Sequence, residues 1–166
     1  MVEDARPPAM GPRPARAASG KPDEKKVAPM KNHMIAIAKS LYDCIGKLDV
    51  DGACSLLADD VEAVFPFALR DRRVEGREAV RSRLNVVVPR LFKSIDFTFA
   101  RFYFCAEDNA LIAQLSSTGV RAKGTLPYEN EYVAILIFDG DQITYWAEYY
   151  DMIKGAGGID RLVPRA

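Results

Sequence analysis

The sequence predicts an α+β domain in which three N-terminal helices pack on one face of a curved, conical antiparallel β-sheet. Two observations support this fold class. Apolar residues recur at steps of three and four in the first half of the chain, as in helices with one buried face. The second half alternates long strand-like runs with short turn sequences, as in neighbouring antiparallel strands. Helices followed by a run of strands are typical of α+β domains.

The first thirty residues differ from the rest of the chain. They hold six of the ten prolines and no apolar run. Such a segment buries too little apolar surface to offset the entropy lost on ordering. We therefore expect a disordered Pro/Ala/Arg-rich tail over 1–30, one domain over 31–155 and a flexible tail over 156–166. Translation from Met30 or Met34 is an alternative start that stays open.

Three helices are predicted between the tail and the strands. The first begins near Asn32, and its apolar stripe consists of Met34, Ile37, Ala38, Leu41, Tyr42, Ile45 and Leu48. The second is short, with Asp51 as its expected N-cap and with the inward-facing residues Ala53, Leu56 and Leu57. The third covers about 77–91 and presents one face made of Val80, Leu84, Val87 and Leu91.

The strands are predicted from short apolar, β-branched runs. One strand is expected over 61–67, ended by Pro66, and a hairpin or loop leads from it to Gly76. Four long strands follow, in the stretches SIDFTFARFYFC, NALIAQLSSTGVRA, YENEYVAILIF and QITYWAEYYD, with AEDN and DGD as turns. A long helix lying across a strongly curved sheet leaves an opening at one end. We therefore expect a conical cavity lined by alternate strand residues.

Composition excludes several classes of function. Lys plus Arg equals Asp plus Glu at 23 each, so no net field attracts nucleic acid or an acidic membrane. Cys44, Cys54 and Cys105 form no CxxC pair, which argues against a disulfide scaffold or zinc site and fits a reducing cytoplasm. The single histidine, His33, is too little for a His-rich metal site. Nucleotide-binding glycine motifs and metal signatures are absent from the sequence, so we expect no cofactor and no metal.

Three stretches, in this order and spacing, resemble a known superfamily: LDVDGACSLLADDVEAVFPF, RRVEGREAVRSRL and YENEYVAILIFDGDQITYWAEYYD. They resemble the nuclear-transport-factor-2-like proteins, which include ketosteroid isomerase, SnoaL-type polyketide cyclases and phenazine-biosynthesis PhzA and PhzB proteins. The resemblance covers roughly residues 33–155 and implies a cone-shaped pocket for a small molecule. It implies the fold more strongly than the activity, because this fold hosts many unrelated reactions.

The resemblance also implies site residues, and departures from it exclude some reactions. The general base of ketosteroid isomerase would fall on Phe65, which cannot take a proton, and that enzyme's oxyanion-hole tyrosine falls near Tyr42. Dehydratases of this fold use an Asp-His pair, for which His33 lies too early in the chain. The aspartate that SnoaL uses matches Asp151, and the glutamate of the phenazine proteins matches Glu148. These two acidic residues are therefore the candidates for acid/base catalysis.

Strand alternation ranks Glu148 ahead of Asp151. Trp146, Glu148 and Tyr150 share one strand face, so a carboxylate between two rings in a dry cone should have a raised pKa. A pKa near neutrality suits a general acid or base. Alternatively, Glu148 is a surface carboxylate paired with Arg70 or Arg101. Asp151 reaches the same cavity only through a bulge, and is otherwise an exposed strand-end residue or a cap.

Eight further residues are predicted to contact a substrate: Tyr42, Phe65, Phe67, Gln114, Asn130, Tyr132, Trp146 and Tyr150. Among these, Asn130, Gln114 and Tyr42 would orient substrate oxygens, and the aromatic residues would form the wall. Two alternatives remain open. The polar residues could belong to a solvated face or a dimer contact, and the aromatic residues could be plain core.

These features predict a small cofactor-free enzyme of the cytoplasm. It would bind a hydrophobic, oxygenated small molecule, such as a polyketide or other secondary-metabolite intermediate, and catalyse acid/base cyclisation, isomerisation, dehydration or condensation. Two alternatives are a non-catalytic module that binds or shields a small molecule, and a pericyclase that acts through pocket shape alone. An outer sheet face with Val133, Ile135 and Ile137 is too apolar to leave in water, which predicts a homodimer.

Overall fold

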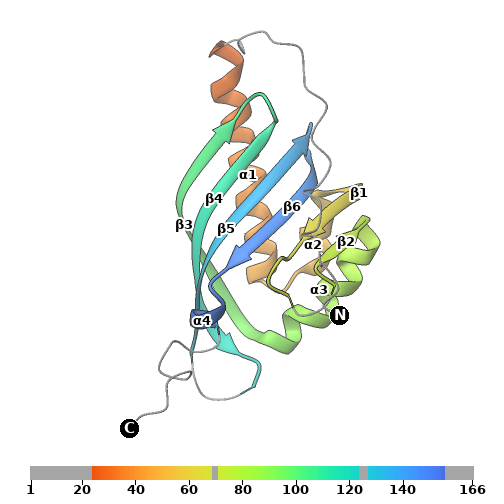
Figure 1. Ribbon diagram of the computed structural model, residues 1–166, viewed down its shortest axis with the longest axis vertical. Coiled ribbons are helices and arrows are strands. Elements are labelled where there is room, and N and C mark those ends of the chain that lie inside the picture. The colour runs from red at the N-terminus through yellow and green to blue at the C-terminus, as the bar shows by residue number, and fades with distance from the viewer. Residues whose placement is uncertain (1–23, 69–70, 124–126, 156–166) are drawn as a thin grey trace, which may run out of the picture.

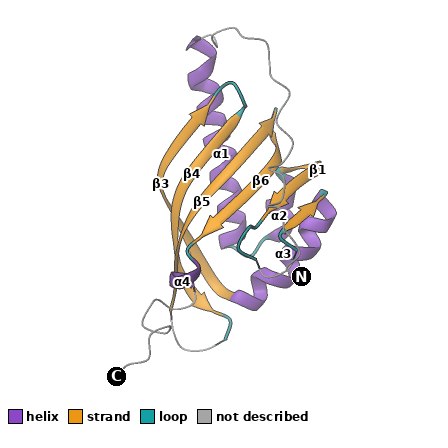
Figure 2. Ribbon diagram, viewed as in Figure 1, coloured by secondary structure: helices purple, strands orange, loops and turns teal. Residues whose placement is uncertain are grey.

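The computed structural model describes residues 24–68, 71–123 and 127–155. In this part of the chain a single six-stranded sheet is covered on one face by helices, as Figures 1 and 2 show. The predicted α+β class, with a curved sheet packed by three helices from the first half of the chain, is confirmed. Of the tails expected over 1–30 and 156–166, residues 1–23 and 156–166 lie outside the described residues.

The strand order in the sheet is β2-β1-β6-β5-β4-β3. The strands are β1 Leu57–Val64, β2 Arg73–Glu75, β3 Phe92–Cys105, β4 Ala110–Arg121, β5 Pro127–Asp139 and β6 Gln142–Tyr150. Strands β3 to β6 form an antiparallel meander, in which tight turns join β3 to β4 and β5 to β6. The prediction of an antiparallel sheet needs one correction, because β1 pairs with β6 in parallel. A long connection separates these two strands, so no hairpin fixes their relative direction.

Four helices are described: α1 Glu24–Gly46, α2 Val50–Ser55, α3 Arg77–Leu91 and α4 Met152–Gly155. Helix α1 begins at Glu24 rather than near Asn32, so residues 24–30 of the predicted disordered tail are helical and include Pro29. The composition of 1–30 as a whole obscured the helix-forming sequence EKKVA at its end. None of the described helices is long and apolar enough to cross a membrane.

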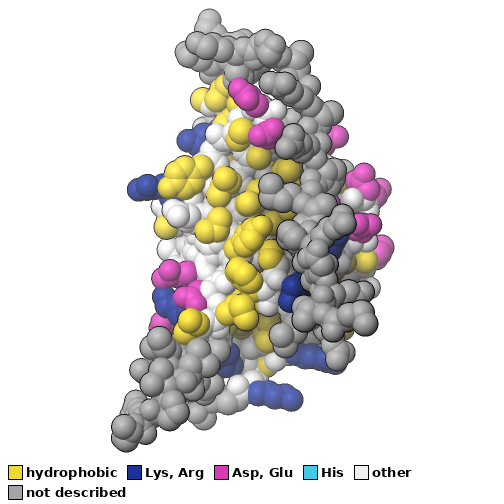
Figure 3. Space-filling view, viewed as in Figure 1, with side chains coloured by type: hydrophobic (Ala, Val, Ile, Leu, Met, Phe, Trp, Pro, Cys, Tyr) yellow, Lys and Arg dark blue, Asp and Glu magenta, His cyan; other side chains and the backbone are white. Residues whose placement is uncertain are grey.

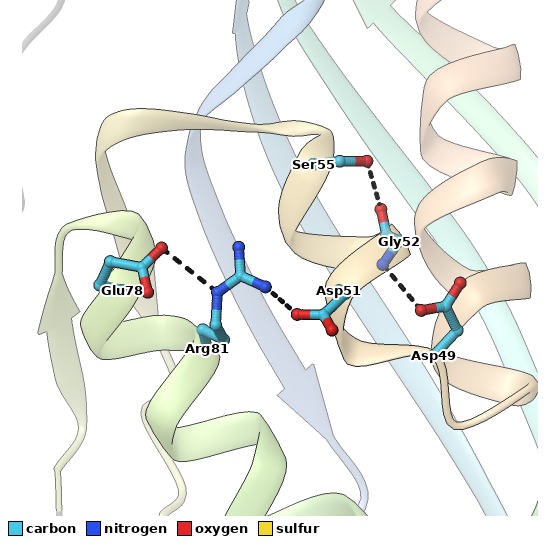
Figure 4. Close-up of polar contacts among 6 residues, drawn as sticks. All are labelled: Asp49, Asp51, Gly52, Ser55, Glu78 and Arg81. Carbon is cyan, nitrogen blue, oxygen red and sulfur yellow. Dashed lines mark hydrogen bonds and ion pairs between the residues drawn. The ribbon is translucent and has the colours of Figure 1, made fainter.

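Asp49, not Asp51, caps α2. The Asp49 Oδ1 atom accepts a hydrogen bond of 2.8 Å from the Gly52 backbone N–H, which would otherwise lack a partner in the first turn. Asp51 instead pairs with Arg81 of α3, whose guanidinium also contacts Glu78 at 3.2 Å (Figure 4). The capping prediction was therefore wrong by two residues, and the Asp51 carboxylate joins α2 to α3.

The core lies between the helices and the concave face of the sheet. From α1 it takes Ala38, Leu41 and Tyr42, each with at most 1% of its surface exposed. From α3 it takes Val80, Leu84 and Val88. The predicted face of α3 also included Val87 and Leu91, and these two residues line a cavity beside the core. Leu91 is 49% exposed for this reason, although its position in the apolar pattern suggested full burial.

Replacing the cap residue tests this assignment. Asp49→Ala is expected to lower the free energy of unfolding by about 1 kcal/mol, because the Gly52 N–H loses its acceptor. Asp49→Asn keeps an acceptor oxygen and should cost much less. Urea denaturation of both variants measures the difference. An equal loss in both variants would show that charge rather than capping stabilises this end of α2.

Candidate active site

A cavity of about 420 Å³ opens between α3 and the concave face of the sheet. Its apolar wall includes Phe65, Leu84, Val88, Ile95, Phe97 and Trp146. Polar side chains also reach it, namely Arg83, Arg121, Tyr128, Asn130, Tyr132 and Glu148. A mostly apolar concave pocket with a few converging polar groups is typical of small-molecule sites. The predicted cavity is therefore present.

Glu148 faces this cavity from β6. In the strand register it lies opposite Ala134, and it shares its face with Trp146 and Tyr150, which also line the cavity. The hydroxyl of Tyr42, on α1, donates a hydrogen bond of 2.8 Å to the Glu148 Oε2 atom. No other described residue donates a hydrogen bond to this carboxyl group, so Oε1 is the oxygen left to exchange a proton with a ligand.

Burial sets the charge of this pair. Glu148 keeps some exposed area, but protein surrounds its carboxyl, and the loss of hydration raises its pKa to about 7. The hydrogen bond from Tyr42 acts in the opposite direction, because it favours the ionised carboxylate. Burial also holds the pKa of Tyr42 well above its usual range, and the neighbouring Glu148 adds to this shift. Tyr42 therefore remains a donor, while Glu148 exists in both protonation states near neutral pH.

Trp146 brings a second donor to the same end of the cavity. Its side chain is 1% exposed, and its ring packs edge-on against Phe65 at 5.3 Å and Tyr42 at 6.4 Å between centroids. The indole N–H lies close enough to the Tyr42 hydroxyl to oppose slightly the rise that burial causes in the phenol's pKa. Its geometry is nevertheless too poor for a hydrogen bond, and Nε1 has no partner among the described residues. The indole N–H is therefore a buried donor whose neighbour is the Tyr42 hydroxyl, and the ring rather than the N–H faces the cavity.

A chain of hydrogen-bonded groups forms another part of the wall. The Tyr132 hydroxyl lies 3.0 Å from Ser117 Oγ and 2.9 Å from the Tyr128 hydroxyl, to which Asn130 Nδ2 donates at 2.8 Å. The Asn130 Oδ1 atom accepts a hydrogen bond from the backbone N–H of Glu131. Asn130 is thus a buried wall residue whose amide is already bonded to the protein. Burial raises the pKa of Tyr132, so its hydroxyl stays protonated.

Two predicted site residues lie on the wrong side of the sheet. Asp151 is exposed, and its Oδ1 atom accepts the backbone N–H groups of Ile153 at 2.9 Å and Lys154 at 3.0 Å. It begins α4 as a cap, which is the alternative that sequence analysis left open. Gln114 is exposed and pairs with Val133 on the outer face. Neither Asp151, predicted as the alternative to Glu148, nor Gln114 lines the cavity of Glu148; both border a separate hollow that also includes Phe67, Tyr132 and Tyr150.

The error for Gln114 came from the register between two strands. Odd-numbered residues of β4 pair with even-numbered residues of β5, so Leu115 and Ser117, not Gln114, share the face of Tyr132. Turn length fixes this offset, and sequence alternation alone cannot supply it. Tyr42 needs a smaller correction. It does not line the cavity but lies behind Glu148, so it contacts the carboxylate rather than the ligand.

The remaining predicted wall residues do line the cavity: Phe65, Phe67, Asn130, Tyr132, Trp146 and Tyr150. Phe67 is 41% exposed, and its ring contacts Tyr149 and Tyr150. Of the proposed surface partners of Glu148, Arg101 instead reaches the Tyr103 hydroxyl, and Arg70 lies outside the described residues.

Sequence analysis missed three polar residues of the cavity, namely Arg83, Arg121 and Tyr128. Arg121 has the same strand parity as Leu115 and Ser117, so alternation along β4 could have indicated it. Within the described ranges, no three His, Cys, Asp or Glu side chains lie together as a metal site would need. The cavity therefore offers a ligand one carboxyl group and several hydrogen-bond donors.

The SnoaL-like domain family matches residues 38–146 of the chain. The search of curated proteins found no match to the chain. Among solved structures, a putative isomerase from Bacillus subtilis is 19% identical and has a TM-score of 0.70, covering 78% of this chain and 96% of that one. An LEH-like epoxide hydrolase from M. tuberculosis is 18% identical, with a TM-score of 0.62 and coverage of 78% and 91%.

A third similar structure is TerC co-crystallized with polyporic acid. It is 15% identical, has a TM-score of 0.62, and covers 73% of this chain and 93% of that one. At such identities these likenesses show the fold alone, and they agree with the resemblance to the nuclear-transport-factor-2-like superfamily inferred from the sequence. Because the family match spans most of the sheet and its covering helices, the chain belongs to the SnoaL-like domain family.

Proposed function

We propose that the protein is an enzyme that binds an apolar, oxygenated small molecule in this cavity and moves a proton with Glu148. One observation supports this most directly. The carboxyl of Glu148 lines the cavity, and burial brings its pKa to about 7. A carboxylic acid whose pKa lies near the working pH can both accept and return a proton. Most structural carboxylates are ionised at that pH and exposed to water.

Each neighbouring side chain would have a separate role in catalysis. Tyr42 fixes the orientation of the carboxyl through Oε2 and favours its ionised form. The indole ring of Trp146 packs edge-on against Tyr42 and would hold the phenol in place against the carboxyl. The aromatic wall excludes water and holds the ring system of the ligand. Together these groups suit cyclisation, isomerisation, dehydration or condensation.

The likenesses reported above support this class of ligand without identifying it. One similar protein is described as a putative isomerase, another as an epoxide hydrolase, and a third was crystallised with polyporic acid. We propose a polyketide or another secondary-metabolite intermediate for the present chain, because aromatic residues dominate the wall near Glu148. The three free cysteines fit the reducing cytoplasm, which we propose as its location.

A generic proton-abstraction probe tests the role of Glu148 before the natural substrate is known. 5-Nitrobenzisoxazole is a flat, oxygenated aromatic compound that a carboxylate base opens by removing one C–H proton, with release of a coloured phenolate. The ionised carboxylate is the active form, so the rate should rise with pH through a midpoint near 7 and then level off. Glu148→Gln should lower the rate by about a hundredfold or more. Absorbance of the released phenolate measures both effects.

Asp151→Asn is the matched control, because it neutralises a carboxylate on the outer face and should leave the rate unchanged. Equal rates for the wild type and Glu148→Gln would contradict the proposed base. With a natural ligand, binding without conversion in both proteins would support a binding or shielding module. Turnover that resists Glu148→Gln but is lost in Trp146→Ala would support closure driven by pocket shape alone.

We further propose that two copies of the chain pair through the outer face of the sheet. An outer apolar strip crosses this face, formed by Ile112, Val133, Ile135, Ile137 and Tyr149. Figure 3 shows hydrophobic side chains gathered along the middle of this face. Such a continuous apolar surface is unusual on a monomer.

Light scattering coupled to size exclusion tests this pairing. The wild type should elute as a dimer over a range of concentrations, and Val133→Lys should shift it toward the monomer, because a charge would be buried in the interface. Thr118→Lys adds the same charge to an exposed position of the same face outside the strip and should have little effect. A wild-type protein that is monomeric at every concentration would contradict the proposal.

A further inference from the structure

Arg121 lies at the end of β4 and lines the same cavity as Glu148. Its Nη2 atom donates a hydrogen bond of 2.7 Å to the backbone oxygen of Gly155, in α4. Its guanidinium also lies over the Tyr128 ring, 5.0 Å from the centroid. These two contacts hold the side chain against the cavity wall instead of letting it extend into solvent.

Within the described part of the chain, the charge of Arg121 is not balanced nearby. Among the described residues no carboxylate lies within ion-pair distance of it. Its Nε atom is buried and has no hydrogen-bond partner in the same part of the chain. Arginine is always charged in proteins, and burying its donors unsatisfied is costly. Arg83 is the other arginine of the cavity, and it has a carboxylate nearby. Its Nη1 atom lies 3.9 Å from Asp71 Oδ2, and its guanidinium lies over the Phe65 ring.

Arg121 and Glu148 lie far apart along the cavity. Across the sheet Glu148 is level with Ala134, which in turn is level with Ala113 of β4. Arg121 lies eight residues further along the same strand, a distance of about 26 Å on a flat strand that the curvature shortens. The hydroxyls of Tyr132 and Tyr128 lie between them. The tyrosine pair therefore separates a ligand group at Arg121 from the proton-transfer site.

We propose that Arg121 is an anion-binding anchor of this cavity, and that the natural ligand is an elongated apolar molecule carrying a carboxylate or another oxyanion at one end. The proposal rests on the proposed function only in taking this cavity as the ligand site. The anion would accept hydrogen bonds from the guanidinium N–H groups that are not bonded to Gly155, as planar oxyanions commonly do with arginine. Binding energy gained at this end positions the other end of the ligand at Glu148.

A matched pair of dyes tests the anchor. 1-Anilinonaphthalene-8-sulfonate and N-phenyl-1-naphthylamine share one ring skeleton, and only the first carries an anionic group. Trp146 is the only tryptophan of the chain and lies in the cavity wall, so energy transfer from it detects a dye bound in this cavity. In the wild type the sulfonate should bind more tightly than the neutral dye.

Three variants separate charge from packing. Arg121→Met should weaken sulfonate binding about tenfold or more and leave the neutral dye unchanged, because a charge-assisted hydrogen bond is lost. Arg121→Lys should retain more of the affinity than Arg121→Met, and Arg101→Met, on an exposed site outside the cavity, should change neither dye. Circular dichroism and the thermal midpoint show whether each variant is folded.

Two results would overturn the anchor. The first is a wild type that binds the neutral dye as tightly as the sulfonate, which needs no variant to be folded. The second is an equal loss of both dyes in Arg121→Met, which would make Arg121 a packing residue only. Both results are independent of proton transfer. A failed anchor with an active Glu148 would leave the proposed function in place, and an inert Glu148 with an anion-selective cavity would remove only the catalytic claim.

Discussion

The hydrogen bond between Tyr42 and Glu148 links the fold to the chemistry we propose. Tyr42 belongs to the buried stripe of α1, and Glu148 belongs to the concave face of β6, so this contact joins helix and sheet in the middle of the core. A carboxyl placed there loses hydration, which raises its pKa, and the tyrosine donor partly offsets that cost. The resulting group is near its titration midpoint at neutral pH.

The rest of the cavity can be understood as support for that group. Trp146 and Phe65 pack edge-on beside it and keep water away from it. Polar groups that do not face an apolar ligand are bonded to one another, as in the chain from Ser117 to Asn130. Arg121 differs from these groups, because among the described residues no carboxylate pairs with it and its Nε has no partner, and this suggests a charged end on the ligand.

Sequence alone was sufficient for most of the fold and for the key strand residue. Helical and strand periodicity located α3 and the four long strands, and parity within β6 placed Glu148 with Trp146 and Tyr150. How neighbouring strands and helices are aligned was harder to predict from the sequence. The offset of β4 against β5, which puts Gln114 outside and Arg121 inside, depends on turn geometry, and the role of Asp151 depends on a helix of four residues. That Tyr42 lies behind Glu148 depends on how α1 packs.

The most direct test of the account is the pKa of Glu148 itself, measured by carbon NMR on protein labelled at the glutamate carboxyls, with Glu148→Gln identifying the signal. We expect titration near pH 7 in the wild type. In Tyr42→Phe the midpoint should move higher, because the ionised form loses its hydrogen bond. A midpoint near 4.5 in the wild type, as for an exposed glutamate, would contradict the claim that this carboxyl is buried and poised for proton transfer.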